Sequence, residues 1–141
     1  MKREDLFSQR PGQPTDVPFI SKTWIQGLYG GNHWFNIIPW EVYVSHYAKI
    51  IETVLARPGT QITVTCLKDD PDCIIGYAVW DERASGRALH WVHVKAAWRN
   101  TGVARSTIPE GINQITHTTK AGLGMRNSMQ QWEWVFNPFT L

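Results

Sequence analysis

Apolar side chains recur at spacings of three and four in two segments of the first 60 residues, which predicts two amphipathic helices. The first helix begins near Asp16, a candidate N-cap, carries Pro18 in its first turn and ends at Gly30-Gly31. The second begins at Pro39 and ends at 57–60. Its apolar stripe consists of Trp40, Tyr43, Val44, Tyr47, Ile50, Ile51, Val54 and Leu55.

The period then changes to two, which is typical of β-strands. Residues 1–17 precede all of this as a polar segment, with at most a short strand near Leu6-Phe7. After residue 60 the pattern predicts a strand at 62–67, a turn at 69–72, strands at 73–80 and 88–94, a short helix from Gly102 to Pro109, a strand at 115–119, a helix at 125–133 and an aromatic tail at 134–139 that packs on the sheet edge.

The strand at 88–94 is apolar on both faces, with Val92 and Val94 on one and Leu89 and Trp91 on the other. Strands of this kind are covered on both sides, so it is predicted to be central and buried. The order of helices and strands predicts a mixed α/β fold, with one sheet layer and helices on it.

Composition is that of a folded domain, because 43% of the 141 residues are apolar and 18% are charged. One domain over 1–141 is expected. No apolar run could span a bilayer or act as a secretory signal, so we expect a cytoplasmic protein that does not bind membranes.

The two cysteines form neither a disulfide framework nor a zinc site, and no other cluster of metal ligands is seen. A hairpin centred between Asp69 and Asp70 would place Cys66 opposite Cys73. In a cytoplasmic protein both are expected to be reduced.

Charge is distributed unevenly along the chain, although the net charge is only +2. Residues 83–132 hold seven basic side chains and one acid, and an acidic cluster at 69–82 precedes them. This favours an anion-binding region in the second half, and a solvated basic face is the alternative.

The segment from Val92 to Arg105 predicts an anion site, because a buried strand turns directly into a helix with glycine at the turn. Free backbone N–H groups at a helix N-terminus point outward, and the helix dipole favours negative charge there. Gly102 lets an oxygen approach the backbone, and Arg99 and Arg105 add positive charge.

The run Arg99-x-x-Gly102-x-Ala104 after Val92-x-Val94 resembles the pyrophosphate loop of the GNAT-type N-acetyltransferases, which bind acetyl-coenzyme A. With the order of elements, the resemblance covers residues 18 to 136. An ordinary glycine-containing turn is the alternative interpretation. The chain also looks like small GNAT-like proteins of bacteriophages, which share its Leu89-His90-x-Val92 strand and its aromatic-Asn-Pro-aromatic tail; a phage protein would work in the host cytoplasm.

The resemblance implies a mostly antiparallel sheet flanked by helices, in which the strand holding Val92 and Val94 splays from the strand at 115–119. Pantetheine amides would pair with the free strand, and a backbone N–H near Val94 would polarise the thioester carbonyl. No metal is needed. The cofactor-binding residues implied are Val92, His93, Val94, Arg99, Asn100, Thr101, Gly102, Val103, Ala104, Arg105 and Asn127.

His90 is the candidate catalytic base, because a neutral imidazole can take a proton from the attacking amine at cellular pH. Related enzymes carry a strand histidine at the corresponding place as base or relay. We expect it to share a face with Ala88 and Val92, and a hydrogen-bonded core histidine is the alternative. His93 is expected on the opposite face, and no context supports a role for His117.

The general acid is unassigned, because tryptophans stand where family members carry a tyrosine in the last helix, leaving Ser128 or Tyr77. The acceptor is an amine of a small molecule or a protein, and the aromatic connection at 29–35 either walls its pocket or packs in the core. The rival hypotheses are a module that binds CoA or another protein without catalysis, and a phage factor that binds or modifies DNA. The oligomeric state is open, and a homodimer is one possibility.

Overall fold

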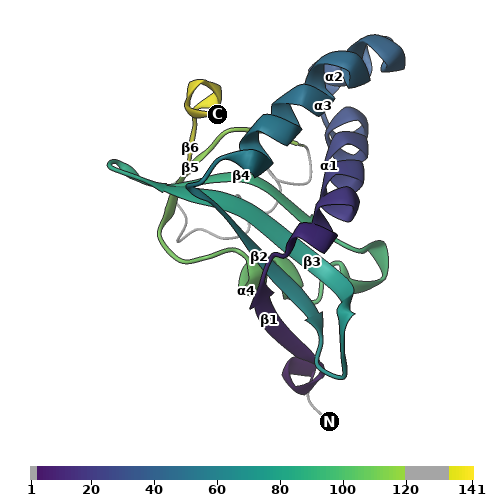
Figure 1. Ribbon diagram of the computed structural model, residues 1–141, viewed down its shortest axis with the longest axis vertical. Helices are drawn as coiled ribbons and strands as arrows, with labels where there is room; N and C mark the ends of the chain where they lie inside the picture. Colours follow the sequence, from purple (N-terminus) through teal and green to yellow (C-terminus); the bar gives the residue numbers. More distant parts are fainter. Residues whose placement is uncertain (1–2, 120–133) are drawn as a thin grey trace.

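The computed structural model describes residues 3–119 and 134–141 as a six-stranded sheet with helices on both faces (Figure 1). Short 3-10 turns join some of the elements. In chain order the main elements are β1 (Phe7–Pro11), α1 (Val17–Gly31), α2 (His33–Asn36), α3 (Trp40–Ala56), β2 (Thr60–Leu67), β3 (Asp70–Arg83), β4 (Gly86–Val94), α4 (Val103–Thr107), β5 (Ile112–Ile115) and β6 (Val135–Phe136).

The strands follow one another across the sheet in the order β1-β2-β3-β4-β5-β6. The first four are antiparallel, whereas β5 runs parallel to β4 and β6 runs parallel to β5. The predicted α/β class is confirmed, and β4 is central, as the apolar pattern of 88–94 predicts.

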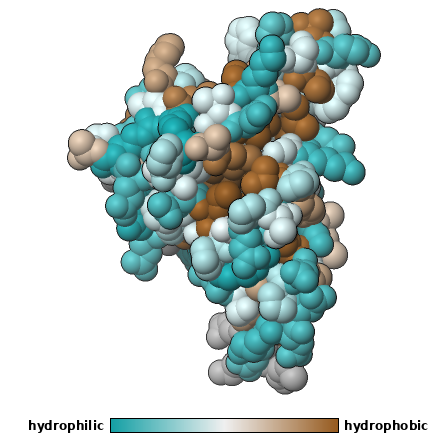
Figure 2. All heavy atoms as spheres, in the orientation of Figure 1, coloured by the Kyte–Doolittle hydropathy of each residue, from teal (hydrophilic) through white to brown (hydrophobic). Residues whose placement is uncertain are grey.

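Helices α1 and α3 pack on one face of the sheet, and α4 packs on the other (Figure 1). Each helix of the pair buries one stripe, as the sequence predicts. The stripe of α1 is Ile20, Trp24 and Leu28, and that of α3 is Tyr43, Tyr47, Ile51 and Val54. Figure 2 shows apolar residues in a band from the α2–α3 end toward the middle of the molecule.

The buried residues of α1 and α3 form one hydrophobic core with the sheet, and a second hydrophobic core lies on the α4 face. It consists of Ala78, Leu89, Ile108, Ile112, Ile115 and Trp134. The aromatic tail therefore lies at the sheet edge and supplies the edge strand β6, but only Trp134 packs in the core, whereas Phe136 and Phe139 are 49% and 95% exposed.

Asp16 begins α1 as predicted, but its side chain makes no capping hydrogen bond to the helix. Instead its carboxylate accepts two hydrogen bonds from the Arg10 guanidinium, at 2.7 and 2.9 Å, and one from the Gln13 backbone N–H at 2.7 Å. These bonds fasten β1 to the start of α1.

Several predicted boundaries are wrong. The polar N-terminal segment supplies a complete edge strand, β1, which pairs with β2. The strand expected at 115–119 lies earlier, at Ile112–Ile115, because Gly111, with φ of +82°, turns the chain into it directly after the Pro109 break. The helix expected at 125–133 lies outside the described residues.

The β2–β3 hairpin does not bring the cysteines opposite one another. Irregular pairing near the turn places Cys66 opposite Ile74 and Leu67 opposite Asp70. Both cysteines are free, Cys66 within the core and Cys73 partly exposed. Among the described residues, no helix combines the length and apolar character needed to cross a membrane.

Candidate functional site

The central feature of the candidate site is a gap between β4 and β5. These parallel strands are paired only from Arg87 to Leu89, and the last hydrogen bond runs from the Thr116 N–H to the Leu89 C=O at 3.1 Å. From Trp91 to Val94, β4 continues with β3 as its only strand partner among residues 3–119 and 134–141. The sequence-based expectation of splayed central strands therefore agrees with the fold.

Backbone groups of β4 point into this gap. The Lys95 N–H donates to the Ile75 C=O at 2.9 Å, which makes this a hydrogen-bonded pair of the antiparallel ladder. Such pairs alternate with pairs whose backbone groups face outward, so those of Val92 and Val94 face away from β3. The Val94 C=O accepts from Arg99 Nε at 3.1 Å, which leaves the Val94 N–H and both groups of Val92 directed into the gap.

A β-bulge interrupts β4 at His90. Val79 pairs with Trp91 and Trp80 with Leu89, so that His90 is an extra residue in the strand. The bulge changes the side-chain alternation, and Leu89 therefore packs with Val92 on the α4 face. The prediction that Leu89 shares a face with Trp91 is wrong for this reason.

The bulge also turns the His90 side chain to the α1–α3 face. There it lies with Asp81, whose register partner is Ala88, and away from Val92. His90 therefore shares a face with Ala88, as predicted, but not with Val92.

The His90 ring is 1% exposed, and both of its nitrogens are hydrogen-bonded. Nε2 lies 2.8 Å from an Asp81 carboxylate oxygen and Nδ1 lies 2.9 Å from Thr116 Oγ1. Burial lowers the pKa of His90, although the Asp81 carboxylate opposes that shift. His90 is consequently neutral at physiological pH and has no direct path to a ligand.

Asp81 is held as a carboxylate by its neighbours. The Arg83 guanidinium donates two hydrogen bonds to it, at 2.7 and 3.0 Å. Burial acts to raise the pKa of Asp81, but the hydrogen bonds from Arg83 and His90 outweigh it and lower the pKa.

The hydrogen bonds that join Asp81, His90 and Thr116 extend to His117 and Tyr47, for which the sequence predicted no role. His117 Nδ1 lies 2.9 Å from Thr116 Oγ1, and its Nε2 is hydrogen-bonded to the Tyr47 hydroxyl. Burial, together with the charge of His90, lowers the pKa of His117 to about 4, although a hydrogen bond with the His90 backbone opposes this shift. No local pattern relates residue 47 to residue 117; Tyr47 shows in the sequence only as one member of an apolar stripe.

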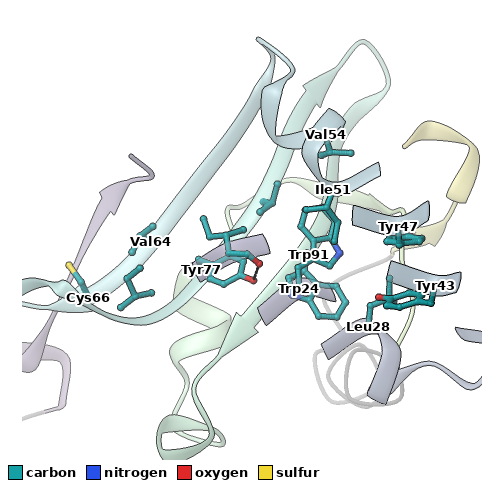
Figure 3. Packing of buried hydrophobic residues seen from close by; sticks show 13 residues of the cluster. Trp24, Leu28, Tyr43, Tyr47, Ile51, Val54, Val64, Cys66, Tyr77 and Trp91 are labelled. Atoms are coloured by element: carbon teal, nitrogen blue, oxygen red, sulfur yellow. Dashed lines mark hydrogen bonds between the residues drawn. The ribbon is translucent and has the colours of Figure 1, made fainter. Parts of the chain in front are cut away.

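The His117 ring packs against aromatic side chains of α1 and β4. Its centroid lies 5.5 Å from that of Trp24 and 6.5 Å from that of Trp91. Figure 3 shows Trp24 and Trp91 packed together, and Tyr43 and Tyr47 projecting from α3 toward the same region.

The anion site that the sequence predicts would lie on the loop from Arg99 to Arg105. Gly102 is the N-cap of α4 and has φ of +86°, and Asn100 has φ of +61°, a backbone conformation that the sequence did not reveal. Apart from the residues adjoining Gly102, no atom of the described part of the chain lies within 4 Å of the position that a Gly102 Cβ would take. Arg99 and Arg105 are exposed beside it.

Other loop residues have structural tasks. Val103 is 2% exposed and anchors the start of α4 in the core, so only its backbone could meet a ligand. The Thr101 hydroxyl donates to the Trp98 C=O. Ala104 is partly buried in the first turn of α4.

His93 and Tyr77 do not reach the gap with their side chains. The His93 ring packs against Phe19 and Tyr77 on the α1 face, and burial lowers its pKa to about 4. The Tyr77 hydroxyl lies 2.7 Å from the Thr23 hydroxyl and donates to the Ile20 C=O, beneath α1. Asn127 and Ser128 lie outside the described residues, and within those residues no three His, Cys, Asp or Glu side chains group as metal ligands would.

The aromatic connection between α1 and α3 divides between core and surface. Tyr29 and Phe35 pack against Tyr43, whereas Trp34 is 75% exposed. Asn32 fixes the connection, because its side chain accepts from the Trp34 and Phe35 N–H groups and donates to the Thr118 C=O. The segment after β5 is thereby tied to the helical face.

Several solved structures that resemble this fold are acetyltransferases. A possible acetyltransferase from Clostridium difficile 630 superposes with a TM-score of 0.58 at 13% identity, covering 94% of each chain. A candidate acetyl transferase from Pyrococcus furiosus gives 0.59 at 11% identity, covering 93% of this chain and 81% of that one. The chain has the GNAT acetyltransferase fold.

The same GNAT fold is seen in a Corynebacterium glutamicum ATCC 13032 structure described as histone acetyltransferase HPA2 and related acetyltransferase. Its TM-score is 0.55 at 17% identity, and the match covers 72% of this chain and 67% of that one. By sequence, no family model and no curated protein matches the chain. The GNAT assignment therefore concerns the fold, and the chemistry has to be argued from the residues.

Proposed function

We propose that the protein is an acetyl-CoA-dependent N-acetyltransferase that acts by direct attack of an amine on the bound thioester. The observation that carries this proposal is the parting of β4 from β5 after Leu89, beside backbone groups of Val92 and Val94 that face the gap. Pantetheine is a linear chain with two amide groups, so it can complete the sheet there as a further strand would.

The pyrophosphate of the cofactor is assigned to the loop over Asn100–Arg105. The first N–H groups of a helix have no partner within the helix, and Gly102 leaves room for phosphate oxygens beside them. Exposed Arg99 and Arg105 supply positive charge at the same place.

The proposed reaction follows from the position at which the cofactor would bind. As the amine attacks, negative charge develops on the thioester oxygen, and a fixed N–H donor such as that of Val94 stabilises it. The bond between carbon and nitrogen forms, the bond between carbon and sulfur breaks, and the amine must lose a proton. His90 is the residue assigned to receive that proton, and its complete burial requires other groups to carry the proton to it.

The acceptor is assigned as an amine of a small molecule or a protein, approached from the α1–α3 side. The exposed aromatic side chains Trp34, in α2, and Trp40, at the first position of α3, suit a cationic or flat acceptor. A cytoplasmic site of action and a phage origin are predictions of the sequence alone.

Calorimetric titration with acetyl-CoA and with CoA tests the proposal. We expect both to bind, and we expect acetyl transfer to at least one member of a panel of primary amines. Absence of binding up to about 1 mM cofactor, a binding free energy weaker than about −4 kcal/mol, would reject the proposal.

A CoA-binding module without catalysis is the second candidate. It is favoured by the position of Tyr77, the described tyrosine considered as general acid, whose hydroxyl is engaged beneath α1. Cofactor binding without transfer to any amine in the panel would decide for this candidate.

A further inference from the structure

Five side chains from four separate parts of the chain form one continuous series of hydrogen bonds. Asp81 Oδ2 lies 2.8 Å from His90 Nε2, His90 Nδ1 lies 2.9 Å from Thr116 Oγ1, and Thr116 Oγ1 lies 2.9 Å from His117 Nδ1. The series ends at the Tyr47 hydroxyl, which is bonded to His117 Nε2. We call these residues the relay.

The direction of every hydrogen bond in the relay follows from the Asp81 carboxylate, which can only accept. His90 must therefore donate through Nε2–H, and because His90 is neutral, its Nδ1 accepts from the Thr116 hydroxyl. Thr116 has then used its proton, so its oxygen accepts from His117 Nδ1–H. His117 Nε2 is left unprotonated and accepts from the Tyr47 O–H.

The relay lies where the gap between β4 and β5 begins. The Thr116 N–H makes the last hydrogen bond between the two strands, and His90 is the bulged residue at the same level. From there the relay passes along the α1–α3 face to α3, the face on which Trp91 packs (Figure 3). Tyr47, on α3, is therefore the end of the relay opposite the buried pair of His90 and Asp81.

We propose that the relay carries the proton of the attacking amine from the Tyr47 hydroxyl to His90, an inference that rests on the proposed acetyl transfer. The amine proton moves to Tyr47 Oη as the bond between nitrogen and carbon forms. The phenolic proton moves to His117 Nε2, the His117 Nδ1 proton to Thr116, and the Thr116 proton to His90 Nδ1. His90 is then an imidazolium facing the Asp81 carboxylate, and every other atom keeps its valence.

The reverse sequence discharges the relay. The thioester carbon has released the CoA thiolate, and the proton stored on His90 returns through Tyr47 to that sulfur. The products are the amide and the free thiol, and the protein ends the turnover as it began. Tyr47 is the catalytic residue in this scheme, and the other four position or store the proton.

The charges around the relay suit a proton that is stored only briefly. His90 faces the Asp81 carboxylate, which favours the imidazolium, and its burial together with Arg83 and Arg57 opposes it. Burial also lowers the pKa of His117 to about 4, so both rings are neutral at rest. A resting relay that is neutral at both rings can accept one proton.

The histidine tautomers provide a test that needs neither cofactor nor acceptor. In ¹⁵N spectra of histidine-labelled protein, we expect His90 to carry its proton on Nε2 and His117 to carry its proton on Nδ1. Thr116→Val removes the oxygen that orders the two rings and should change the His117 tautomer, whereas Thr116→Ser should keep it. A His117 that is protonated on Nε2 in the unmodified protein would overturn the relay.

Kinetics with acetyl-CoA and an amine from the panel supply the second test. Tyr47→Phe and Thr116→Val should each lower kcat by about 10²-fold, with the KM for acetyl-CoA unchanged, and Thr116→Ser should restore most of the rate. The dependence of kcat on the fraction of D2O in the solvent (a proton inventory) should indicate that several protons move in the rate-limiting step of the unmodified protein. Tyr47→Phe should reduce that number.

Tyr43→Phe is the matched control, because Tyr43 stacks on Tyr47 from the same helix but donates to the Ile25 C=O. It should leave kcat within about threefold of the unmodified protein, well short of the effect expected for loss of proton transfer. Equal losses in the two variants, or no loss in Tyr47→Phe, would overturn the relay even where the cofactor binds. Absence of cofactor binding would instead reject the proposed function, whatever tautomers the histidines show.

Discussion

Single residues with unusual backbone conformation shape the loop before α4. Gly102, at φ of +86°, is the residue at which the chain turns into α4, whose first N–H groups have no partner within the helix. A side chain at this position would occupy the open space in which a phosphate is expected, since nothing else lies within 4 Å. The loop therefore depends on glycine for both conformation and access.

Gly102→Val is expected to weaken CoA binding by at least about 10-fold, because the branched side chain fills the space above the backbone N–H groups. The left-handed conformation adds a cost of about 1–2 kcal/mol in stability. Gly111→Val is the matched control, because Gly111 has φ of +82° and lies outside the loop. Calorimetry and urea unfolding of both variants separate the two effects, and normal CoA binding by Gly102→Val would show that the loop assignment is wrong.

His90→Gln is expected to reduce turnover by about 10²-fold with cofactor affinity nearly unchanged, because glutamine cannot store a proton. The rate of the unmodified protein should fall on the acidic side below about pH 6.5, since burial lowers the pKa of His90 below that ordinary value. The variant should lack this acidic limb. Comparison of the two pH–rate profiles checks the prediction, with His46→Gln, at an exposed position on α3, as control; an unchanged profile would make His90 a core residue.

The sequence identifies residues whose role depends on a local pattern and misses those whose role depends on distant contacts. Val94 and Gly102 belong to one continuous strand-turn-helix segment, which can be recognised from the sequence alone. His117 gains its importance from Tyr47, 70 positions away, and from a tautomer set by Asp81. Long-range hydrogen bonds of this kind leave no periodic trace.

At the level of elements, the bulge in β4 determines which side chains share a face. Strict alternation from Leu89 to Val92 predicts opposite faces, but the extra residue at His90 brings both to the α4 face. Helices α1 and α3 were predictable because many turns repeat the same apolar spacing. One inserted residue in a strand has no such redundancy, and the sequence does not show it.

Helix α4 is short, and a buried pair of hydroxyls holds it on the sheet. Thr65 Oγ1 of β2 lies 2.7 Å from Thr107 Oγ1 of α4, and the Thr107 hydroxyl donates to the Val103 C=O. Because Thr107 has only one proton, Thr65 must be the donor between the two hydroxyls.

Thr107→Val is therefore expected to cost about 1–3 kcal/mol of stability, since it leaves the Thr65 hydroxyl buried without an acceptor. Thr65→Val should cost less, because Thr107 keeps its bond to Val103. The double variant should be more stable than Thr107→Val alone, since no unpaired donor remains. Urea unfolding of the three variants measures these differences, and additive losses would contradict the assigned direction.

For the whole molecule, folding reduces the charge separation that the sequence suggests. Arg83 pairs with Asp81 at 2.7 Å and Arg87 pairs with Glu82 at 2.7 Å, so part of the basic half neutralises the acids that precede it. Within the described residues, the positive charge exposed beside the α4 loop comes from Arg99 and Arg105. This arrangement suits a local anion such as a pyrophosphate better than an extended polyanion.

Stability of the whole protein should fall as the pH decreases from about 6.5 to 4, because His93 and His117 are held neutral in the fold. Burial lowers the pKa of each to about 4, with contributions from Arg99 and Lys95 at His93 and from His90 at His117. In the unfolded chain each returns to about 6.5 and binds a proton that the native state excludes. Protons therefore favour unfolding within this window, by at most about 1.4 kcal/mol per pH unit for His117.

Urea unfolding at half-unit steps from pH 7 to pH 4.5 measures this dependence. His93→Gln should reduce the slope, because one proton-binding group is lost from the unfolded state, and His46→Gln should leave it unchanged, because His46 lies exposed on α3. The carboxylates of Asp16 and Asp81 have lowered pKa values, so their contribution is lost mainly at still lower pH and has the same sign. Stability that stays constant between pH 6.5 and 4.5 would mean that His117 is protonated within the fold, and the resting relay would then lack the unprotonated Nε2 that Tyr47 requires.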